Sequence, residues 1–384
     1  MTGSYTNSLT MTSRQRIMAA LMHQQPDRVP LDLGSTLVTG ISIQAYRGLI
    51  DELNIHQDQI KVYDHEAQLA EVDEKVLRHL QIDTRGVRPG MSKKRSGITP
   101  DGDGIWDEWG FWRKRSPDTG TYFIVKGPLE GEISTHDILK HPMPDPKDPA
   151  RVAGLRQKIM DLRVQNDCAI MLTVPANFIL TSMELRGFED FYIDSCNNQQ
   201  LLGFLMDRVL EIQMEICDNI LQEVGDIIDV AVNFDDLAIQ DRLMVSPRVF
   251  NSLLLPRLEK LYMRIKSKTG AKILHHSDGA IKPILADLVD IGIDAINPLQ
   301  VTAKGMDNLE ELKREFGKDL TFWGGIDTQY LLPRGTPDEV RTSVRRTIEI
   351  LNKDGGYVLC PVHNIQKDVP PENILALYET ALNT

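Results

Sequence analysis

The sequence contains little cysteine, with four residues in 384, and these four show no CxxC spacing. So sparse a set excludes a disulfide framework and indicates a reducing compartment. Residues 1–12 carry no apolar signal core, and no uninterrupted apolar run later in the chain reaches membrane length. Together these features predict a cytoplasmic protein.

Positive charge is also scarce. The chain has 43 lysines and arginines against 55 aspartates and glutamates, giving a formal net charge of -12. This balance argues against sequence-independent binding of nucleic acid and against adhesion to an anionic membrane. The expected partners are therefore a small molecule or another protein.

No glycine-rich GxGxxG loop follows any expected strand, which argues against a doubly wound open sheet. Short apolar segments instead alternate with segments of helical periodicity, in the first 80 residues and again from residue 149 onward. The expected strands are 29–33, 169–174, 227–232, 272–274, 295–296, 321–323 and 357–359. The expected helices are 13–22, 43–53, 71–80, 201–223, 247–268, 281–291, 309–316, 337–351 and 371–382. About eight such units predict an α/β chain that forms one (β/α)8 TIM barrel over residues 1–384, with an N-terminal helical extension.

Residues 84–148 interrupt this alternation with glycines, prolines and alternating polar and apolar positions. The pattern predicts a β-hairpin insertion in the barrel. Trp106, Trp109 and Trp112, three of the four tryptophans, lie within it. The insertion is either a lid over a pocket or a local hydrophobic cluster, since aromatic rings supply large apolar area in both cases.

Polar side chains follow several expected strands, at the end where a (β/α)8 barrel carries its active site. They include Asn177 and Glu184 after one strand, and Asp235 and Asp236 after the next. Others are His276, Asp278, Asn297, Asp327, Cys360, His363 and Asn364. One such residue is commonly a helix cap or turn former, and capping remains the alternative for the Asp235–Asp236 pair. Several at equivalent positions predict a site at the barrel mouth.

His276 and Asp278 stand two residues apart at the end of an expected strand, so both can point to one spot. With Cys360 they offer a nitrogen, an oxygen and a thiolate, a set suited to zinc with a fourth position open for substrate. Thiolate ligation disfavours magnesium and calcium. The alternative is a hydrogen-bonded core histidine at 276 and a helix-capping aspartate at 278.

Six segments carry a family resemblance, in the same order along nearly the whole chain. They are RQRIMAAL at 14–21, PDRVP at 26–30, LRGFEDF at 185–191, HSDG at 276–279, GGID at 324–327 and PVHNIQ at 361–366. The chain resembles the uroporphyrinogen decarboxylase superfamily. That resemblance implies a (β/α)8 barrel and allows a homodimer.

The superfamily includes porphyrin decarboxylases and zinc methyltransferases that serve corrinoid proteins. Decarboxylases carry an arginine-rich RQAGR element after the first strand, whereas residues 33–40 here read LGSTLVTG. Carboxylate recognition by arginine is thus missing from that place. The methyltransferase branch uses a histidine, a cysteine two residues later and a distant cysteine as zinc ligands. His276 and Cys360 match this pattern, and Asp278 departs from it.

An oxygen ligand makes zinc more Lewis acidic than a second thiolate does, which favours the polarisation of an ether oxygen. The resemblance therefore implies an O-demethylase, in which Zn²⁺ on His276, Asp278 and Cys360 binds a methoxylated aromatic substrate. The Co(I) of a separate corrinoid (cobalamin) protein would accept the methyl group. Expected acid or orienting groups are Asp235, Asp236 and His363, and expected substrate contacts are Asn177, Glu184, Asn297, Asp327 and Asn364.

Other functions remain open at this stage. The same site could take methyl from an amine or thioether, or move it between a corrinoid and a thiol or pterin. A decarboxylase related to uroporphyrinogen decarboxylase, or a non-catalytic tetrapyrrole or corrinoid binder, is the alternative of a different class.

Overall fold

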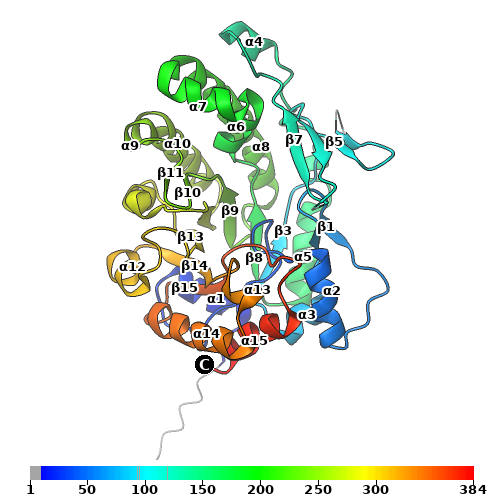
Figure 1. Ribbon diagram of the computed structural model, residues 1–384, viewed down its shortest axis with the longest axis vertical. Coiled ribbons are helices and arrows are strands. Elements are labelled where there is room, and N and C mark those ends of the chain that lie inside the picture. Colours follow the sequence, from blue (N-terminus) through cyan, green and yellow to red (C-terminus); the bar gives the residue numbers. More distant parts are fainter. Residues whose placement is uncertain (1–9, 93, 95, 119) are drawn as a thin grey trace, which may run out of the picture.

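The computed structural model describes residues 10–92, 94, 96–118 and 120–384. Its centre is a curled parallel sheet of seven strands in the order β15-β14-β13-β12-β9-β8-β3 (Figure 1). These strands are β3 (Thr84–Val87), β8 (Ala169–Thr173), β9 (Val230–Phe234), β12 (Lys272–His276), β13 (Ala295–Leu299), β14 (Thr321–Ile326) and β15 (Tyr357–Pro361). Six of them match expected strands, because buried apolar runs of four to six residues between helical segments identify them well.

Residues 30–32 close the gap between the two edges of this sheet. Leu31 forms a parallel bridge with Leu359, and the Leu359 and Asp32 N–H groups donate to the Pro30 and Leu359 carbonyls at 2.9 and 3.1 Å. On the other side, the Asp83 N–H donates to the Leu31 carbonyl at 2.9 Å. The strands therefore form a closed (β/α)8 barrel, and the predicted fold class is confirmed.

Helices follow the strands and cover the outside of the barrel (Figure 1). They are α1 (Ser13–Leu21), α2 (Ile43–Glu52), α3 (Glu74–His79), α5 (Leu155–Gln165), α6 (Phe178–Arg186), α7 (Phe188–Asn197), α8 (Gln199–Val224), α9 (Pro247–Val249), α10 (Leu255–Lys266), α11 (Leu285–Asp290), α12 (Leu309–Phe316), α13 (Leu331–Arg334), α14 (Pro337–Leu351) and α15 (Pro371–Leu382). Short 3₁₀ turns occupy Pro149–Arg151 and Lys282–Ile284. A π-helical turn, Phe250–Leu254, directly precedes α10, which has Pro256 in its first turn.

Successive side chains of a strand point to opposite faces of the sheet, so every second side chain of each barrel strand points into the barrel interior. Val232, Leu274, Trp323, Val358 and Cys360 belong to a single buried cluster that also includes apolar residues of α1. At the amino-terminal end of the barrel, α1 is joined to the strand region through hydrogen bonds such as Gly356 N–H to the Ala20 carbonyl at 3.0 Å. The expected N-terminal helix therefore seals one end of the barrel, which leaves the opposite end for a site.

The insertion differs from expectation in its start and in its size. β3 pairs with β8 throughout its length, so Thr84–Val87 belongs to the barrel and the insertion begins later. It forms a four-stranded antiparallel sheet, not a single hairpin, in the order β4 (Gly97–Ile98), β5 (Gly104–Trp106), β6 (Trp112–Arg115) and β7 (Tyr122–Lys126). Helix α4 (Thr135–Lys140) follows it. The four short strands carry no helical periodicity, and the first two are too short to be recognised singly.

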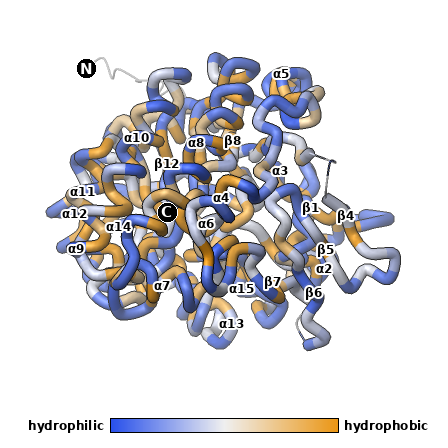
Figure 2. The backbone as a smooth tube through the Cα atoms, turned by 90° about the horizontal axis from the view of Figure 1, so that it is seen from above, coloured by the Kyte–Doolittle hydropathy of each residue, from blue (hydrophilic) through white to orange (hydrophobic). Residues whose placement is uncertain are grey.

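Many outer turns of the backbone consist of hydrophilic residues, and the peripheral helices alternate between hydrophilic and hydrophobic residues (Figure 2). Such alternation is typical of helices that pack one side against a core. In the part of the chain that the structure describes, no helix is both long enough and apolar enough to span a membrane.

Candidate metal centre

The centre of the candidate site is His276, the last residue of β12. Strand alternation turns its side chain to the barrel interior and turns that of His275 to the outside. His276 is 4% exposed, and its Nδ1–H donates to Oδ1 of Asn297, on the neighbouring strand β13, over 2.5 Å. The amide group of Asn297 donates in turn to the Trp323 carbonyl at 3.3 Å. Because Nδ1 carries the proton, Nε2 of His276 presents a lone pair.

Two further ligand atoms approach that lone pair. Oδ2 of Asp278 lies 3.9 Å from Nε2 of His276 and also 3.9 Å from Nε2 of His363. The two imidazole rings are 5.7 Å apart between centroids. One potential ligand atom from each of His276, Asp278 and His363 falls within 4.8 Å of the other two. Burial lowers the pKa of His363, which favours the neutral imidazole that a metal requires, although Asp278 opposes this shift.

The loop that carries Asp278 is held by a short hairpin of two strands, β10 (Ala238–Ile239) and β11 (Arg242–Leu243), and by the residues that precede it. The Asp278 N–H donates to Oδ1 of Asp236 at 2.8 Å, and the Ala280 N–H donates to the Ile239 carbonyl at 2.9 Å. Gly279 has φ +97, and a Cβ at this position would lie 2.6 Å from the Ile239 oxygen. Only glycine fits there, so this part of the HSDG motif serves a close backbone approach.

Cys360 is not a member of this group, and the prediction that it supplies the third ligand needs correction. β15 extends to Pro361, so Cys360 lies within the sheet, paired with Gly325, and not in the loop that follows. Its side chain is fully buried in the apolar interior cluster. Burial raises the pKa of the Cys360 thiol well above its usual range. His363, expected only as a catalytic group, stands in the third position.

His275, the neighbour of His276, is fully buried on the outer side of β12. Its Nδ1 hydrogen-bonds with the Tyr262 hydroxyl at 2.6 Å. Burial lowers the pKa of His275 to about 3. The histidine pair in the sequence therefore splits between one structural residue and one residue of the site.

Asp235 and Asp236 have different environments. Both carboxylate oxygens of Asp235 accept backbone N–H bonds, from Ile179 at 2.8 Å and Leu180 at 2.7 Å, so Asp235 caps the start of α6. Asp236 contacts the site itself, because it holds the Asp278 backbone. Burial raises the pKa of Asp236, and His276 partly counteracts this shift. Asp235 thus caps a helix that precedes it in the chain, whereas Asp236 lies beside the candidate metal ligands.

The residues expected to touch substrate have protein partners in this structure. Asn297 orients His276, and Asp327 accepts N–H bonds from Gln329, Tyr330 and Leu331 at 2.7 to 3.2 Å. Asn364 accepts from Gly40 N–H at 2.6 Å and donates to the Leu37 carbonyl at 2.8 Å, which fixes the loop that follows the first barrel segment. Asn177 accepts from Gln213 at 3.5 Å.

Glu184 forms part of an ion-pair cluster around Arg113 of the insertion. Arg113 lies 2.7 Å from Asp107, 3.1 Å from Glu66 and 3.4 Å from Glu184. Three acids thus share one guanidinium, and burial raises the pKa of Glu184 to about 7. The cluster joins the insertion to α6 on the barrel.

Asp32 is a buried group that the sequence did not single out. It is 0% exposed and accepts hydrogen bonds from Ser35 at 2.5 Å, Thr84 at 2.7 Å and Nε1 of Trp323 at 2.9 Å. Burial raises its pKa, and these three donors oppose the shift. A single charged residue within the apolar strand 29–33 was the available signal.

The profile of the uroporphyrinogen decarboxylase (URO-D) family matches residues 129–383. The chain belongs to the URO-D family. A uroporphyrinogen decarboxylase from Pseudoalteromonas translucida is 28% identical over 135 residues, and this match spans only 34% of the chain and 35% of the relative. Among solved structures, a methyltransferase from Methanosarcina mazei superposes over 97% of this chain and 99% of its own, with a TM-score of 0.65 and 18% identity. That second likeness shows a shared fold.

Proposed function

We propose that this URO-D family member is a metal-dependent methyltransferase that demethylates a methoxylated aromatic substrate and delivers the methyl group to the Co(I) of a separate corrinoid protein. The observation that carries the proposal is the convergence of His276, Asp278 and His363 within 4.8 Å of one another at the barrel mouth. An enzyme that only binds or decarboxylates a porphyrin does not need such a set of ligands.

The three side chains fit a divalent metal. Zinc bonds of about 2.0–2.1 Å in a tetrahedron place neighbouring ligand atoms about 3.4 Å apart. The two measured separations from Asp278 are 3.9 Å, so small side-chain rotations would complete the site. Without a thiolate, the preference for zinc rests on the two imidazoles, which favour transition metals over magnesium and calcium.

Bound Zn²⁺ would supply Lewis-acid polarisation of the ether oxygen of the substrate. A site with two nitrogens and one oxygen is more electrophilic than one with thiolates, which favours ether cleavage over thiol activation. Asn297 keeps Nε2 of His276 directed at the site. Asp236 positions the Asp278 backbone through Oδ1, and its second oxygen would hold the proton that the departing phenolate takes up. The Co(I) of the partner protein would supply the electron pair for the new carbon–cobalt bond, and the pair of the broken methyl–oxygen bond would remain on the phenolate.

The shared fold with the methyltransferase from Methanosarcina mazei supports this proposal, as does the arginine-free segment 33–40. Arg113, a buried arginine of the insertion, is already surrounded by three carboxylates. A polycarboxylate substrate would therefore lack free guanidinium partners at these places. Uroporphyrinogen decarboxylation is the competing function because the family profile and the curated relative carry that name.

The test is a single-turnover assay with purified protein, Zn²⁺, a methoxylated benzoate and a reduced corrinoid. Formation of methyl–Co(III), followed by its absorbance, should depend on zinc, persist in Cys360→Ala and be lost in His363→Ala. Asp236→Asn retains the oxygen that accepts the Asp278 N–H and should slow methyl transfer while zinc remains bound. Release of CO₂ from uroporphyrinogen with no methyl transfer to the corrinoid would support the decarboxylase instead.

A further inference from the structure

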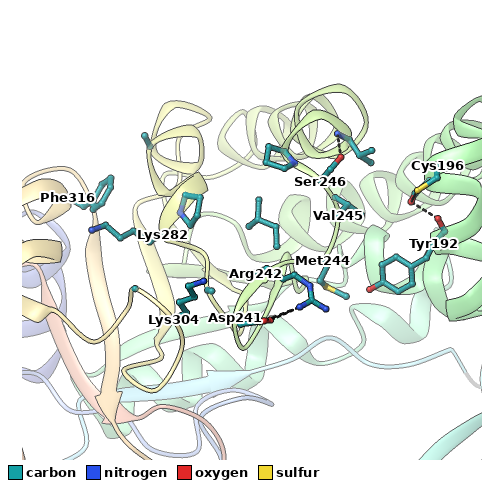
Figure 3. A pocket seen from close by; sticks show the side chains of 18 of the residues that line it. Tyr192, Cys196, Asp241, Arg242, Met244, Val245, Ser246, Lys282, Lys304 and Phe316 are labelled. Atoms are coloured by element: carbon teal, nitrogen blue, oxygen red, sulfur yellow. Dashed lines mark hydrogen bonds and ion pairs between the residues drawn. The ribbon is translucent and has the colours of Figure 1, made fainter.

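A further cavity lies beside the β10–β11 hairpin, which also contacts the metal loop. It measures about 1000 Å³ and is bounded by α7, this hairpin, α9, α11 and the end of α12 (Figure 3). This volume is at the upper end of the range of small-molecule sites. It is separate from the group formed by His276, Asp278 and His363, none of which lines it.

The lining has an apolar part and a cationic part. Leu243, Met244, Val249 and Ala286 supply apolar surface, together with Val245, Pro247, Pro283 and Phe316. In Figure 3 the Tyr192 hydroxyl points inward from one side, and Lys304 and Arg242 are both in the lower part of the view. The cavity can therefore hold an apolar body with a polar group at one end.

The cationic side chains that line the cavity differ in whether they have an ion-pair partner. Arg242 pairs with Asp241 at 3.0 Å, and Lys282 pairs with Glu311 at 3.0 Å and Glu315 at 3.5 Å. Lys304 also lines the cavity and has no ion-pair partner among the residues that the structure describes. One positive charge beside an apolar wall complements an amphipathic ligand with a single negative charge.

The hairpin is a wall shared by this cavity and the metal loop. Arg242 and Leu243 line the cavity, and the Ile239 carbonyl of the same hairpin accepts the N–H of Ala280, which lines the cavity and stands two residues after Asp278. Two hydrogen bonds also connect Gln240 of the hairpin with Gly279. The Gln300 side chain donates to Oε1 of Gln240 at 3.2 Å and accepts the Gly279 N–H at 2.6 Å. A ligand that displaces the hairpin therefore displaces the backbone beside Asp278.

We propose that this cavity is an effector site for an amphipathic monoanion, an aliphatic or aromatic carboxylate in chemical class, whose binding is linked to that of the metal. The apolar body lies against Leu243, Val249 and Ala286, and the carboxylate meets Lys304. Since linkage is reciprocal, metal at the centre changes the affinity of the cavity by the same factor as the ligand changes that of the metal.

The first experiment measures binding of the anionic dye 8-anilinonaphthalene-1-sulfonate to the full chain by fluorescence, without metal. Lys304→Met removes the free charge and should weaken binding about three- to fivefold, the range of an exposed ion pair. Ala286→Trp fills the cavity from an exposed helix position and should abolish the site. Lys75→Met and Ala153→Trp, matched changes at exposed positions elsewhere, should bind the dye as the wild type does. Octanoate should displace the dye at lower concentrations than the uncharged 1-octanol.

The second experiment repeats the titration with saturating Zn²⁺. A change of twofold or more in the dye's Kd in the wild type, absent in His363→Ala, is the expected linkage. Equal dye binding by Ala286→Trp and wild type would refute the site itself, whatever the metal does. Dye binding that responds to Ala286→Trp but not to zinc would refute the effector role. The dye titration without metal is independent of methyl transfer, so failure of the proposed function leaves its outcome unchanged.

Discussion

His276 donates from Nδ1 to the side-chain oxygen of Asn297 across adjacent strands, at 2.5 Å. This bond fixes both the tautomer and the orientation of the imidazole that faces Asp278. Partners of this kind raise the basicity of a histidine ligand and hold its ring in place. The candidate metal centre therefore includes Asn297 as a residue that positions a potential ligand.

Replacement of Asn297 tests this positioning role. Asn297→Ala should weaken zinc binding about 10- to 100-fold, because His276 loses the acceptor that holds its tautomer. Competition with a chromogenic chelator measures the affinity. Asn297→Asp restores an acceptor and should recover most of the loss. Unchanged zinc affinity in Asn297→Ala would show that the imidazole is oriented by other contacts.

Asp32 should be a strong determinant of stability. Asp32→Ala leaves buried donors on Ser35, Thr84 and Trp323 without an acceptor, at about 1–3 kcal/mol for each unsatisfied group. Removal of the buried charge offsets only part of this loss. We therefore expect the free energy of unfolding to fall by about 3 kcal/mol or more. Urea denaturation followed by circular dichroism measures it. Asp32→Asn keeps one oxygen and should lose less; equal stability of wild type and Asp32→Ala would contradict the assignment.

Glu184 predicts a pH dependence of stability. Burial raises its pKa in the folded protein to about 7, above the ordinary value of 4.5 for a glutamate. The folded state therefore binds more protons than the unfolded state between these values, and the contribution of Glu184 to stability falls as pH rises from 4.5 to 7. Glu184→Gln should flatten the decline of Tm over that range. Parallel Tm profiles for wild type and variant would show that Arg113 keeps Glu184 ionised throughout.

The barrel could be predicted because its signals are local. Buried strands such as Ala169–Thr173 and Thr321–Ile326 are continuous apolar runs, and helices such as Pro337–Leu351 begin with a clear cap and proline. β3 was missed because Thr84–Val87 contains a threonine, an arginine and a glycine. Those residues serve contacts that lie far away in sequence, including the Asp32 bond of Thr84 and the Glu74 bonds of Arg85.

Two of the three residues of the candidate metal site could be predicted in the same way. His276 and Asp278 are two residues apart, so their common direction follows from strand geometry. The third ligand depends on where β15 ends, and strand ends are poorly specified by sequence. The expected strand stopped at residue 359, which put Cys360 in the loop, whereas the observed strand continues to Pro361. Two more residues in the sheet bury Cys360 and bring His363 to the mouth.

Metal content of three purified proteins tests the central claim most directly. Wild type, Cys360→Ala and His363→Ala, each reconstituted with equimolar zinc and desalted, are analysed by inductively coupled plasma mass spectrometry. The account predicts one zinc per chain in the wild type and in Cys360→Ala, and less than a tenth of that in His363→Ala. Circular dichroism confirms that each variant is folded. Zinc retained by His363→Ala but lost from Cys360→Ala, or no zinc in the wild type, would contradict the site.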